Sequence, residues 1–375
     1  MSTKRNHRAL GTALVVGAAA FAVASLAPHM QAQQNQQLAL AQPQAPGPQG
    51  PGRGGQQPNA ANIDLHILPV QGNVSMIVGD GGNITMSVGD DGILLVDSGL
   101  DAGADKLIAF LREVAPGKPL RAIINTHYHP DHVGGNAKLS AAGGRIAGGN
   151  EGAGAGAMTP IIAHEEVLNR MSAPSGQQSP YPENAWPSDT YFVAKKEMFF
   201  NNEPIIIEHE PAAHTDGDSF VWFRKSDVVS AGDIFVTTSF PIIDINGGGG
   251  INGIVDGLNR LIDITVPREK QEAGTYVITG HGRLTDEADV VEYRDMTTII
   301  RDRFADAVKK GRTLQQVKDA NLVLDYEGRY GSTNGFWTTD AFVTAVYNDL
   351  TARKAAAEKK AADAAKKPAP APKKK

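Results

Sequence analysis

The order of strand and helix patterns in this sequence predicts an α/β fold in which two β-sheets pack together and helices cover their outer faces. Three observations lead to this prediction. Short strand patterns come first, at 64–70, 74–78, 84–88 and 93–96. Helical patterns then alternate with strands. A second group of strand patterns, at 198–200, 204–209, 219–223 and 228–230, precedes more helices. Strands and helices in both halves favour two sheets with helices outside.

The first half alternates strands with one clear helix. Gly-Asp-Gly-Gly and Gly-Asp-Asp-Gly turns separate its strands. Asp97 closes the strand at 93–96 with a polar residue, as in strands that end at an active-site edge. Residues 102–114 have a helical period that places Leu107 and Leu111 on one face, and 121–125 is a buried strand.

The second half begins with a strand at 161–162 and a short helix at 164–171. The Pro/Ser/Gln-rich segment 173–190 is a long loop, which is more often functional than accidental and can border a substrate cleft. A helix at 251–264 follows four consecutive glycines. A strand at 276–279 and helices at about 286–306 and 337–350 complete the expected elements.

Composition limits the chemistry and the partners. The 375 residues contain no cysteine, so disulfides and thiolate metal ligands are excluded and any metal site uses His, Asp or Glu. The net charge of −5 argues against nucleic-acid binding, and 41% apolar residues suffice for a core. We expect a small-molecule substrate; the sequence indicates no oligomeric state.

Both ends of the chain have biased compositions. Residues 1–32 have a basic start, an uncharged Ala-rich run and small residues at the end, which predicts a secretory signal peptide and a periplasmic or secreted protein. An uncleaved membrane anchor is the alternative; with cleavage, no membrane span remains. We interpret 33–61 as a disordered Gln/Pro/Gly-rich linker, 62–350 as one folded domain and 351–375 as an Ala/Lys/Pro-rich tail. The basic tail can hold the chain near an anionic surface or simply be solvated.

The most informative stretch directly follows the strand at 121–125. It contains His127, His129, Asp131 and His132 within six positions. While the chain is extended, alternate residues project the same way, so His127 and His129 can face one point. Where the chain turns into a helix, Asp131 and His132 can face a neighbouring point. These donors suit one or two borderline metal ions, above all zinc.

Three further candidates lie where strands begin or end. His214 precedes the strand at 219–223, Asp233 follows the strand at 228–230, and His281 stands in Gly-His-Gly after the strand at 276–279. A single histidine is more often structural than functional. Their shared placement beside strand ends makes the set a stronger signal. His66, His164 and His209 lie outside these motifs and are interpreted as structural.

The combination of H-x-H-x-D-H, a His before Thr, a Gly-Asp after a strand and Gly-His-Gly, in this order, resembles the metallo-β-lactamase superfamily over about residues 64–290. The resemblance implies a single-domain, four-layer αβ/βα sandwich with two zinc ions per chain in a cleft. It implies that His127, His129 and His214 hold one ion. Asp131, His132 and His281 would hold the other, and Asp233 would bridge the two, as in glyoxalase II-like members.

Such a centre predicts a hydrolase. Two cations about 3.5–4 Å apart can share a metal-bound hydroxide and polarise a carbonyl. Asp131 can orient that nucleophile and relay a proton to the leaving group. Ligating histidines also need hydrogen-bond acceptors, for which Asp97 is the best candidate.

Two departures bear on the substrate. Asp233 stands nineteen residues after His214, where some zinc β-lactamases carry a cysteine, and Val236 replaces the lysine with which those enzymes bind a β-lactam carboxylate. Asn246 or Asn252 can substitute for it, or can be turn residues. The Asp131–His132 pair resembles the all-nitrogen/oxygen β-lactamases and glyoxalase II. The cleaved bond is therefore expected to be an amide, ester, lactone or thioester, with β-lactamase activity possible in principle.

Other classes of this fold remain alternatives. A glyoxalase II-like thioesterase has the better ligand match but its glutathione-binding tail is not recognisable, and a lactonase is a further candidate. RNA-processing nucleases share H-x-H-x-D-H, although export and net acidity speak against them. Iron-dependent persulfide-oxidising enzymes are a non-hydrolase alternative, because ligands alone do not identify iron, manganese or zinc. Oxygen-reducing iron members carry Glu in place of the second His, which here is His129.

Overall fold

The structure is a computed structural model that describes residues 63–79, 81–146, 158–173, 177–271 and 273–365. The predicted signal peptide and linker, 1–61, and the end of the tail lie outside the described residues. Cleavage, export and the domain boundaries therefore stay predictions. No helix in the described part of the chain is long and apolar enough to cross a membrane.

The first sheet contains the strands of the N-terminal half, in the order β1 to β7. They are β1 (His66–Gln71), β2 (Val74–Val78), β3 (Ile84–Gly89), β4 (Gly92–Val96), β5 (Leu120–Ile124), β6 (Ile161–His164) and β7 (Asp189–Tyr191). The pairs from β1 to β4 are antiparallel. The pairs from β4 to β7 are parallel, so these four strands end at the same edge of the sheet.

The second sheet contains the remaining strands, in the order β13-β12-β11-β10-β9-β8. They are β8 (Lys195–Phe200), β9 (Glu203–His209), β10 (Ser219–Phe223), β11 (Val228–Ser230), β12 (Tyr276–Ile278) and β13 (Leu284–Asp286). Only β11 and β12 are parallel among these pairs. The chain segments that follow β11 and β12 therefore begin at the same edge of the second sheet.

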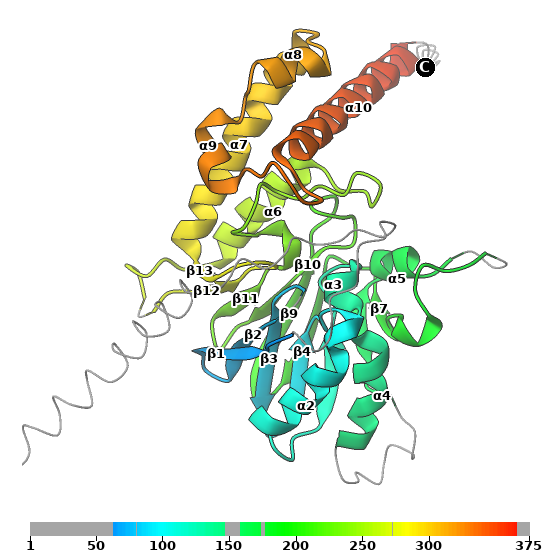
Figure 1. Ribbon diagram of the computed structural model, residues 1–375, viewed down its shortest axis with the longest axis vertical. Coiled ribbons are helices and arrows are strands. Elements are labelled where there is room, and N and C mark those ends of the chain that lie inside the picture. The colour runs from blue at the N-terminus through cyan, green and yellow to red at the C-terminus, as the bar shows by residue number, and fades with distance from the viewer. Residues whose placement is uncertain (1–62, 80, 147–157, 174–176, 272, 366–375) are drawn as a thin grey trace, which may run out of the picture. The chain divides into compact units, whose positions relative to one another are not determined.

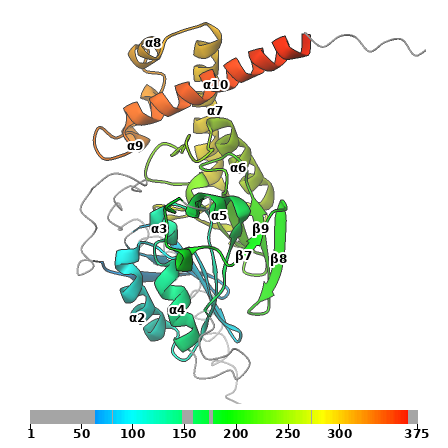
Figure 2. The same cartoon turned by 90° about the vertical axis from the view of Figure 1, so that its right-hand side faces the viewer.

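Helices cover the outer face of each sheet, as Figures 1 and 2 show. The α-helices are α2 (Ala104–Val114), α3 (Pro130–Val133), α4 (Asn136–Ile146), α5 (Glu165–Met171), α6 (Ile251–Ile264), α7 (Glu287–Lys309), α8 (Leu314–Asp319), α9 (Leu324–Tyr330) and α10 (Thr339–Ala365). Short 3-10 turns occupy Asp101–Gly103, Glu183–Ala185 and Gly232–Ile234.

Three apolar cores separate the layers. Leu94 and Val96 of β4 point between the sheets, toward Val221 of the second sheet. Their neighbours Ile93 and Leu95 point to the opposite face and pack against α2 and α4. A third core joins the second sheet to α6, α7 and α10. Helix, sheet, sheet and helix thus follow one another, which confirms the predicted four-layer αβ/βα sandwich.

Several elements differ from the sequence-based expectation. Helix α4 was not expected, because its glycines and small residues weaken the helical signal. The segment 173–190, expected to be structureless, contains a 3-10 turn and the start of β7. Helix α10 continues past residue 350 through Ala365, since Ala and Lys are strong helix formers. Helices α8 and α9 were also not expected.

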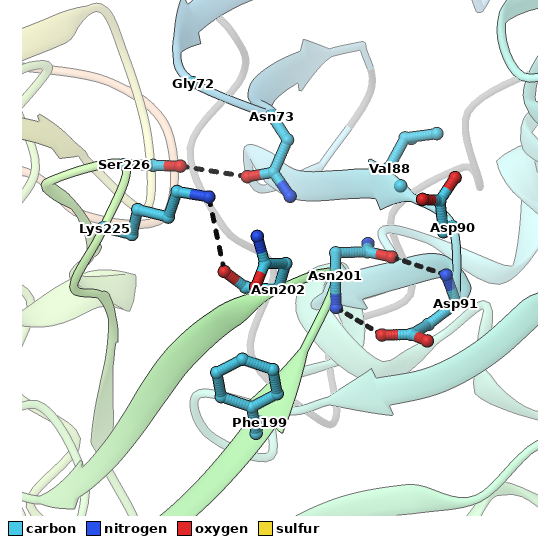
Figure 3. A pocket seen from close by; sticks show the side chains of 11 residues that line it. Gly72, Asn73, Val88, Asp90, Asp91, Phe199, Asn201, Asn202, Lys225 and Ser226 are labelled. Atoms are coloured by element: carbon cyan, nitrogen blue, oxygen red, sulfur yellow. Dashed lines mark hydrogen bonds between the residues drawn. The ribbon is translucent and has the colours of Figure 1, made fainter.

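Hairpin turns close one end of the sandwich, away from the carboxyl ends of β4, β5 and β11. They surround a polar pocket of about 570 Å³ (Figure 3). Ser226 donates to Asn73 across the two sheets at 2.9 Å, and Asn201 exchanges backbone and side-chain hydrogen bonds with Asp91. These polar groups satisfy one another, so they tie the sheets together at this end.

Candidate metal centre

The predicted metal ligands meet at the opposite end of the sandwich. His127 follows β5 by three residues, and Asp131 and His132 lie in α3 directly afterwards. From the second sheet, Asp233 follows β11 and His281 follows its parallel neighbour β12. Gly280 N donates to Gly232 O at 2.9 Å, which holds these two strand ends together. The loop between β9 and β10 supplies His214.

The seven side chains form two buried groups. His127, His129, His214 and Asp233 make one group, and Asp131, His132 and His281 make the other; within each, one donor atom per residue lies within 4.8 Å of the others. Asp233 faces both groups. Its Oδ2 lies 3.7 Å from His214 Nε2, and its Oδ1 lies 3.2 Å from His132 Nε2. This geometry suits the bridging position that the family resemblance implies.

The outward nitrogen of each of four histidines contacts an acceptor that fixes its proton. His132 Nδ1 donates to Asp97 Oδ2 at 2.8 Å, and His214 Nδ1 donates to the Ile242 carbonyl at 2.8 Å. His129 Nε2 donates to Asp244 Oδ2 at 3.0 Å. Thr126 gives its own hydroxyl proton to Asp97, so His127 Nδ1 donates to Thr126 Oγ1. The inward nitrogens are thereby left with lone pairs, the form that binds a metal.

The inward ring nitrogens lie close to one another. His214 Nε2 lies 2.9 Å from His129 Nδ1, and His132 Nε2 lies 3.3 Å from His281 Nε2. Six buried atoms of the cluster have no hydrogen-bond partner: His127 Nε2, His281 Nδ1 and both carboxylate oxygens of Asp131 and of Asp233. Buried polar groups are normally satisfied. Converging lone pairs and unsatisfied carboxylates fit bound cations, so the residues present suit a two-metal centre.

Charge in the cluster is divided between the groups. Burial, then the neighbouring His132 and His214, hold the pKa of His127 well below its usual value. Burial lowers the pKa of His214 to about 4. Burial opposes the charge on His281, but Asp233 and Asp131 outweigh it and raise its pKa to about 9. Burial likewise opposes the charge on Asp233, and His281 and His132 outweigh it, so its pKa lies well below normal. The carboxylates are therefore anionic, as metal ligands must be.

Two glycines allow this close packing. A Cβ on Gly280 would lie 2.0 Å from Asp233 Oδ1, and one on Gly82 would lie 2.3 Å from His132 Cε1. Asp97 adopts a φ of 66°, a left-handed conformation that is unusual for a residue with a side chain. It is held there while its carboxylate bonds Thr126 and His132. Such strain is typical of functional sites.

Residues 69–281, more than half of the 375 residues, match the metallo-beta-lactamase superfamily. The chain belongs to this superfamily. The match contains all seven clustered residues and confirms the family predicted from the motifs. It supports a metal-binding hydrolase fold and leaves the ligand roles of the individual residues as predictions.

Solved metallo-β-lactamase-fold structures resemble this chain. The stereoselective inverting sec-alkylsulfatase Pisa1 from Pseudomonas sp. is 16% identical with a TM-score of 0.54, over 76% of this chain and 50% of that one. The metallo-beta-lactamase from Pontibacter korlensis is 12% identical with a TM-score of 0.46, over 63% of this chain and 99% of that one. The chain thus spans about half the length of the sec-alkylsulfatase. No curated protein matches the sequence. At these identities, the likeness concerns the fold.

Two acidic residues orient the histidines of this metallo-β-lactamase-fold centre. Asp97 was expected as an acceptor, and it does accept from His132. Asp244 was not expected. Its carboxylate accepts from His129, from the Tyr128 hydroxyl and from Gly247 N. The tyrosine stands between the two motif histidines, and the glycine run begins three residues after Asp244, but neither pattern predicts this long-range contact.

We expect Asp244→Asn to lower metal affinity in the His127–His129–His214 group by roughly tenfold, the usual scale for groups that orient metal ligands. The amide lacks the negative charge that attracts the His129 N–H. Its single oxygen must also accept the hydrogen bond from the Tyr128 hydroxyl. Titration with a zinc-competing dye measures the change. Asp263→Asn on the exposed face of α6 is the matched control. Equal affinities in the two variants would contradict the role of Asp244.

The segment after α5 is anchored over the histidine loop. Tyr181 donates from its hydroxyl to the Tyr128 carbonyl at 2.8 Å, and Trp186 Nε1 donates to the Tyr181 carbonyl at 3.0 Å. Trp186 thus holds Tyr181 and the segment around it in place. Asn246 is exposed and its carbonyl accepts from Arg170, and Asn252 lies in α6. No contact of either asparagine side chain supports a substrate role.

His164 and His209 form a separate stacked pair, with ring centroids 3.5 Å apart. His164 Nδ1 accepts from Glu166 N and caps α5, and His209 Nε2 donates to the Asp216 carbonyl. These contacts agree with the structural roles expected for both. Burial, followed by the stacked His209, lowers the pKa of His164 to about 4.

This pair predicts acid sensitivity. Unfolded His164 takes up its proton near pH 6.5 and the folded form only near pH 4, so the free energy of unfolding falls as the pH drops across that window. His164→Asn keeps a capping oxygen without the titration. Between pH 7 and 4 we expect it to lose about 1–2 kcal/mol less stability than the wild type, a figure reduced for screening by solvent. Urea unfolding at several pH values measures the free energy of unfolding of both proteins. An equal dependence on pH in the variant and the wild type would contradict the prediction.

Proposed function

We propose that this protein is an exported, dinuclear zinc-dependent hydrolase that cleaves an amide, ester, lactone or thioester bond. One observation carries the proposal. Two buried donor groups face each other across Asp233, whose carboxylate oxygens have no hydrogen-bond partner. Zinc is favoured because the donors are imidazoles and carboxylates. The N-terminal sequence pattern supports export.

His127, His129 and His214 would hold one ion, Asp131, His132 and His281 the second, and Asp233 both. When bound, two such ions lower the pKa of a shared water and polarise a carbonyl. The chain's own residues arrange this chemistry. Asp97, Thr126, Asp244 and Ile242 fix the histidine tautomers through the hydrogen bonds described above. Asp131 Oδ2 lies 3.2 Å from His281 Nε2, and Asp131 Oδ1 has no partner, so this carboxylate can orient water and carry a proton to the leaving group.

Charges beside the cluster favour an uncharged acyl substrate. Arg170 next to the His214 loop is paired with Asp216, and Arg283 next to His281 is paired with Asp289. Val236, at the position of the β-lactam-binding lysine, is fully buried. Because both cations are already paired with carboxylates, they would attract an anionic group on the substrate only weakly. This supports lactones and thioesters over β-lactams and over sulfate esters of the kind named for the sec-alkylsulfatase.

A hydrolysis panel tests the proposal. The purified protein, reconstituted with zinc, is assayed with a chromogenic cephalosporin, a lactone, a thioester and a sec-alkyl sulfate, and metal is measured on the same sample. We expect about two zinc ions per chain and highest kcat/KM for the lactone or the thioester. Absence of metal, or a single iron with persulfide-oxidising activity, would overturn the mechanism. Preference for the cephalosporin or the sulfate would overturn the substrate class.

A further inference from the structure

Asp349 is a buried carboxylate in α10, outside the residues that match the family. It lies next to the start of α6, although the two are 98 residues apart in sequence: Asp349 Oδ2 accepts from Ile251 N at 3.0 Å. The residue before α6 is Gly250, which offers no side-chain cap. Helix starts need acceptors for their free N–H groups, and a carboxylate there also interacts favourably with the helix dipole. Asp349 therefore caps α6 from a distant helix.

The capped end of α6 directly follows the glycine run 247–250. A Cβ on Gly250 would lie 2.3 Å from Arg353 Nη2 and 3.0 Å from Asp349 Oδ2, so glycine lets α10 approach. Gly250 N donates to the Ala213 carbonyl at 2.9 Å, and Gly249 N donates to the Asp244 carbonyl at 2.8 Å. The run is thus held between α10 and the loop that carries His214.

The segment 242–250, which contains the glycine run, orients two histidines. The Ile242 carbonyl fixes His214, the Asp244 carboxylate fixes His129, and Asp244 N donates to the His214 carbonyl at 3.0 Å. His132 of the other group is instead fixed by Asp97 from the first sheet. A disturbance at the start of α6 is therefore expected to reach His129 and His214 before it reaches His132.

We propose that Asp349 is a positioning residue for this group: through the cap on Ile251 it holds the segment 242–250, and this segment sets the orientation of His129 and His214. The inference rests on the proposed metal-dependent function. It makes the C-terminal helix α10 part of the scaffold of the metal centre.

The test compares variants by zinc competition titration and by the visible spectrum of the cobalt-substituted protein. In Asp349→Ala we expect one of the two affinities to fall about tenfold, with a changed cobalt spectrum, while the other stays unchanged. Asp349→Asn keeps an acceptor oxygen and should stay within about twofold of the wild type. Arg353→Ala removes the exposed partner that orients Asp349 at 2.6 Å, without altering the core, and should give about a threefold loss.

Two variants in α10 serve as controls. Asp363→Ala changes an exposed carboxylate in the same helix. Val346→Ala removes buried volume from the helix but no bond to α6. It should lower Tm while leaving both metal affinities intact. If Val346→Ala weakens the same ion as strongly as Asp349→Ala, general loosening explains the effect and the positioning role is overturned.

Hydrogen exchange provides a readout that does not need bound metal. In the metal-free protein we expect the amides of 247–251 to exchange at least fivefold faster in Asp349→Ala than in Asp363→Ala. Unchanged exchange would overturn the inference whatever the metal content. A wild type that binds fewer than two ions would contradict the proposed function. A wild type with two ions, and unaltered affinities in both Asp349→Ala and Arg353→Ala, would contradict only the role of Asp349.

Discussion

Asp233→Ala is expected to remove metal from both donor groups and to lower kcat/KM at least about a thousandfold. Asp233 is the residue whose two oxygens face different groups, with Oδ1 3.2 Å from His132 Nε2 and Oδ2 3.7 Å from His214 Nε2. Its removal leaves each group with three donors. It also takes away the negative charge that would balance two adjacent cations. Metal analysis after dialysis and steady-state kinetics measure the two effects.

The fold should survive this change. Asp233 makes no hydrogen bond that supports the backbone, and both its oxygens are unsatisfied. In the metal-free protein this carboxylate balances the charge of His132 and His281, so we expect the metal-free variant to keep the fold but to be less stable than the metal-free wild type. Asp256→Ala, on the exposed face of α6, is the matched control and should behave like the wild type. Two retained ions in Asp233→Ala would refute the bridging position.

His129→Ala is expected to abolish measurable turnover while about one ion per chain remains. The change removes Nδ1, which lies 2.9 Å from His214 Nε2, and it leaves the Asp131, His132 and His281 group untouched. One cation alone loses the shared position for water, so we expect kcat to fall by at least about a thousandfold. The far-ultraviolet circular dichroism should remain that of the wild type.

A matched control uses His66, a histidine that is exposed in β1 and pairs with Asp64. His66→Ala should keep both ions and full activity. Substantial activity in His129→Ala would show that the first group is wrongly assigned. Loss of both ions would show instead that the two groups do not bind independently.

Local sequence patterns were sufficient to predict most strands and several helices of this protein. Apolar runs and polar turns predicted most strands, because alternation and turn residues are properties of neighbouring residues. Helix α6 begins and ends where its period predicts, at Ile251 and Ile264. Helix α4 was not predicted, because its stability depends on packing against β5 rather than on its own sequence.

The sequence by itself predicted seven candidate donors and their order, because they stand in short recognisable motifs near strand ends. Only the tertiary structure decided how they are held. Asp244 lies 115 residues from His129, and Asp349 lies 98 residues from Ile251. Nothing in the sequence near either carboxylate indicates its partner. A metal donor is specified by its own side chain and local motif, whereas the residue that orients it is specified by which surfaces the sheets and helices bring together.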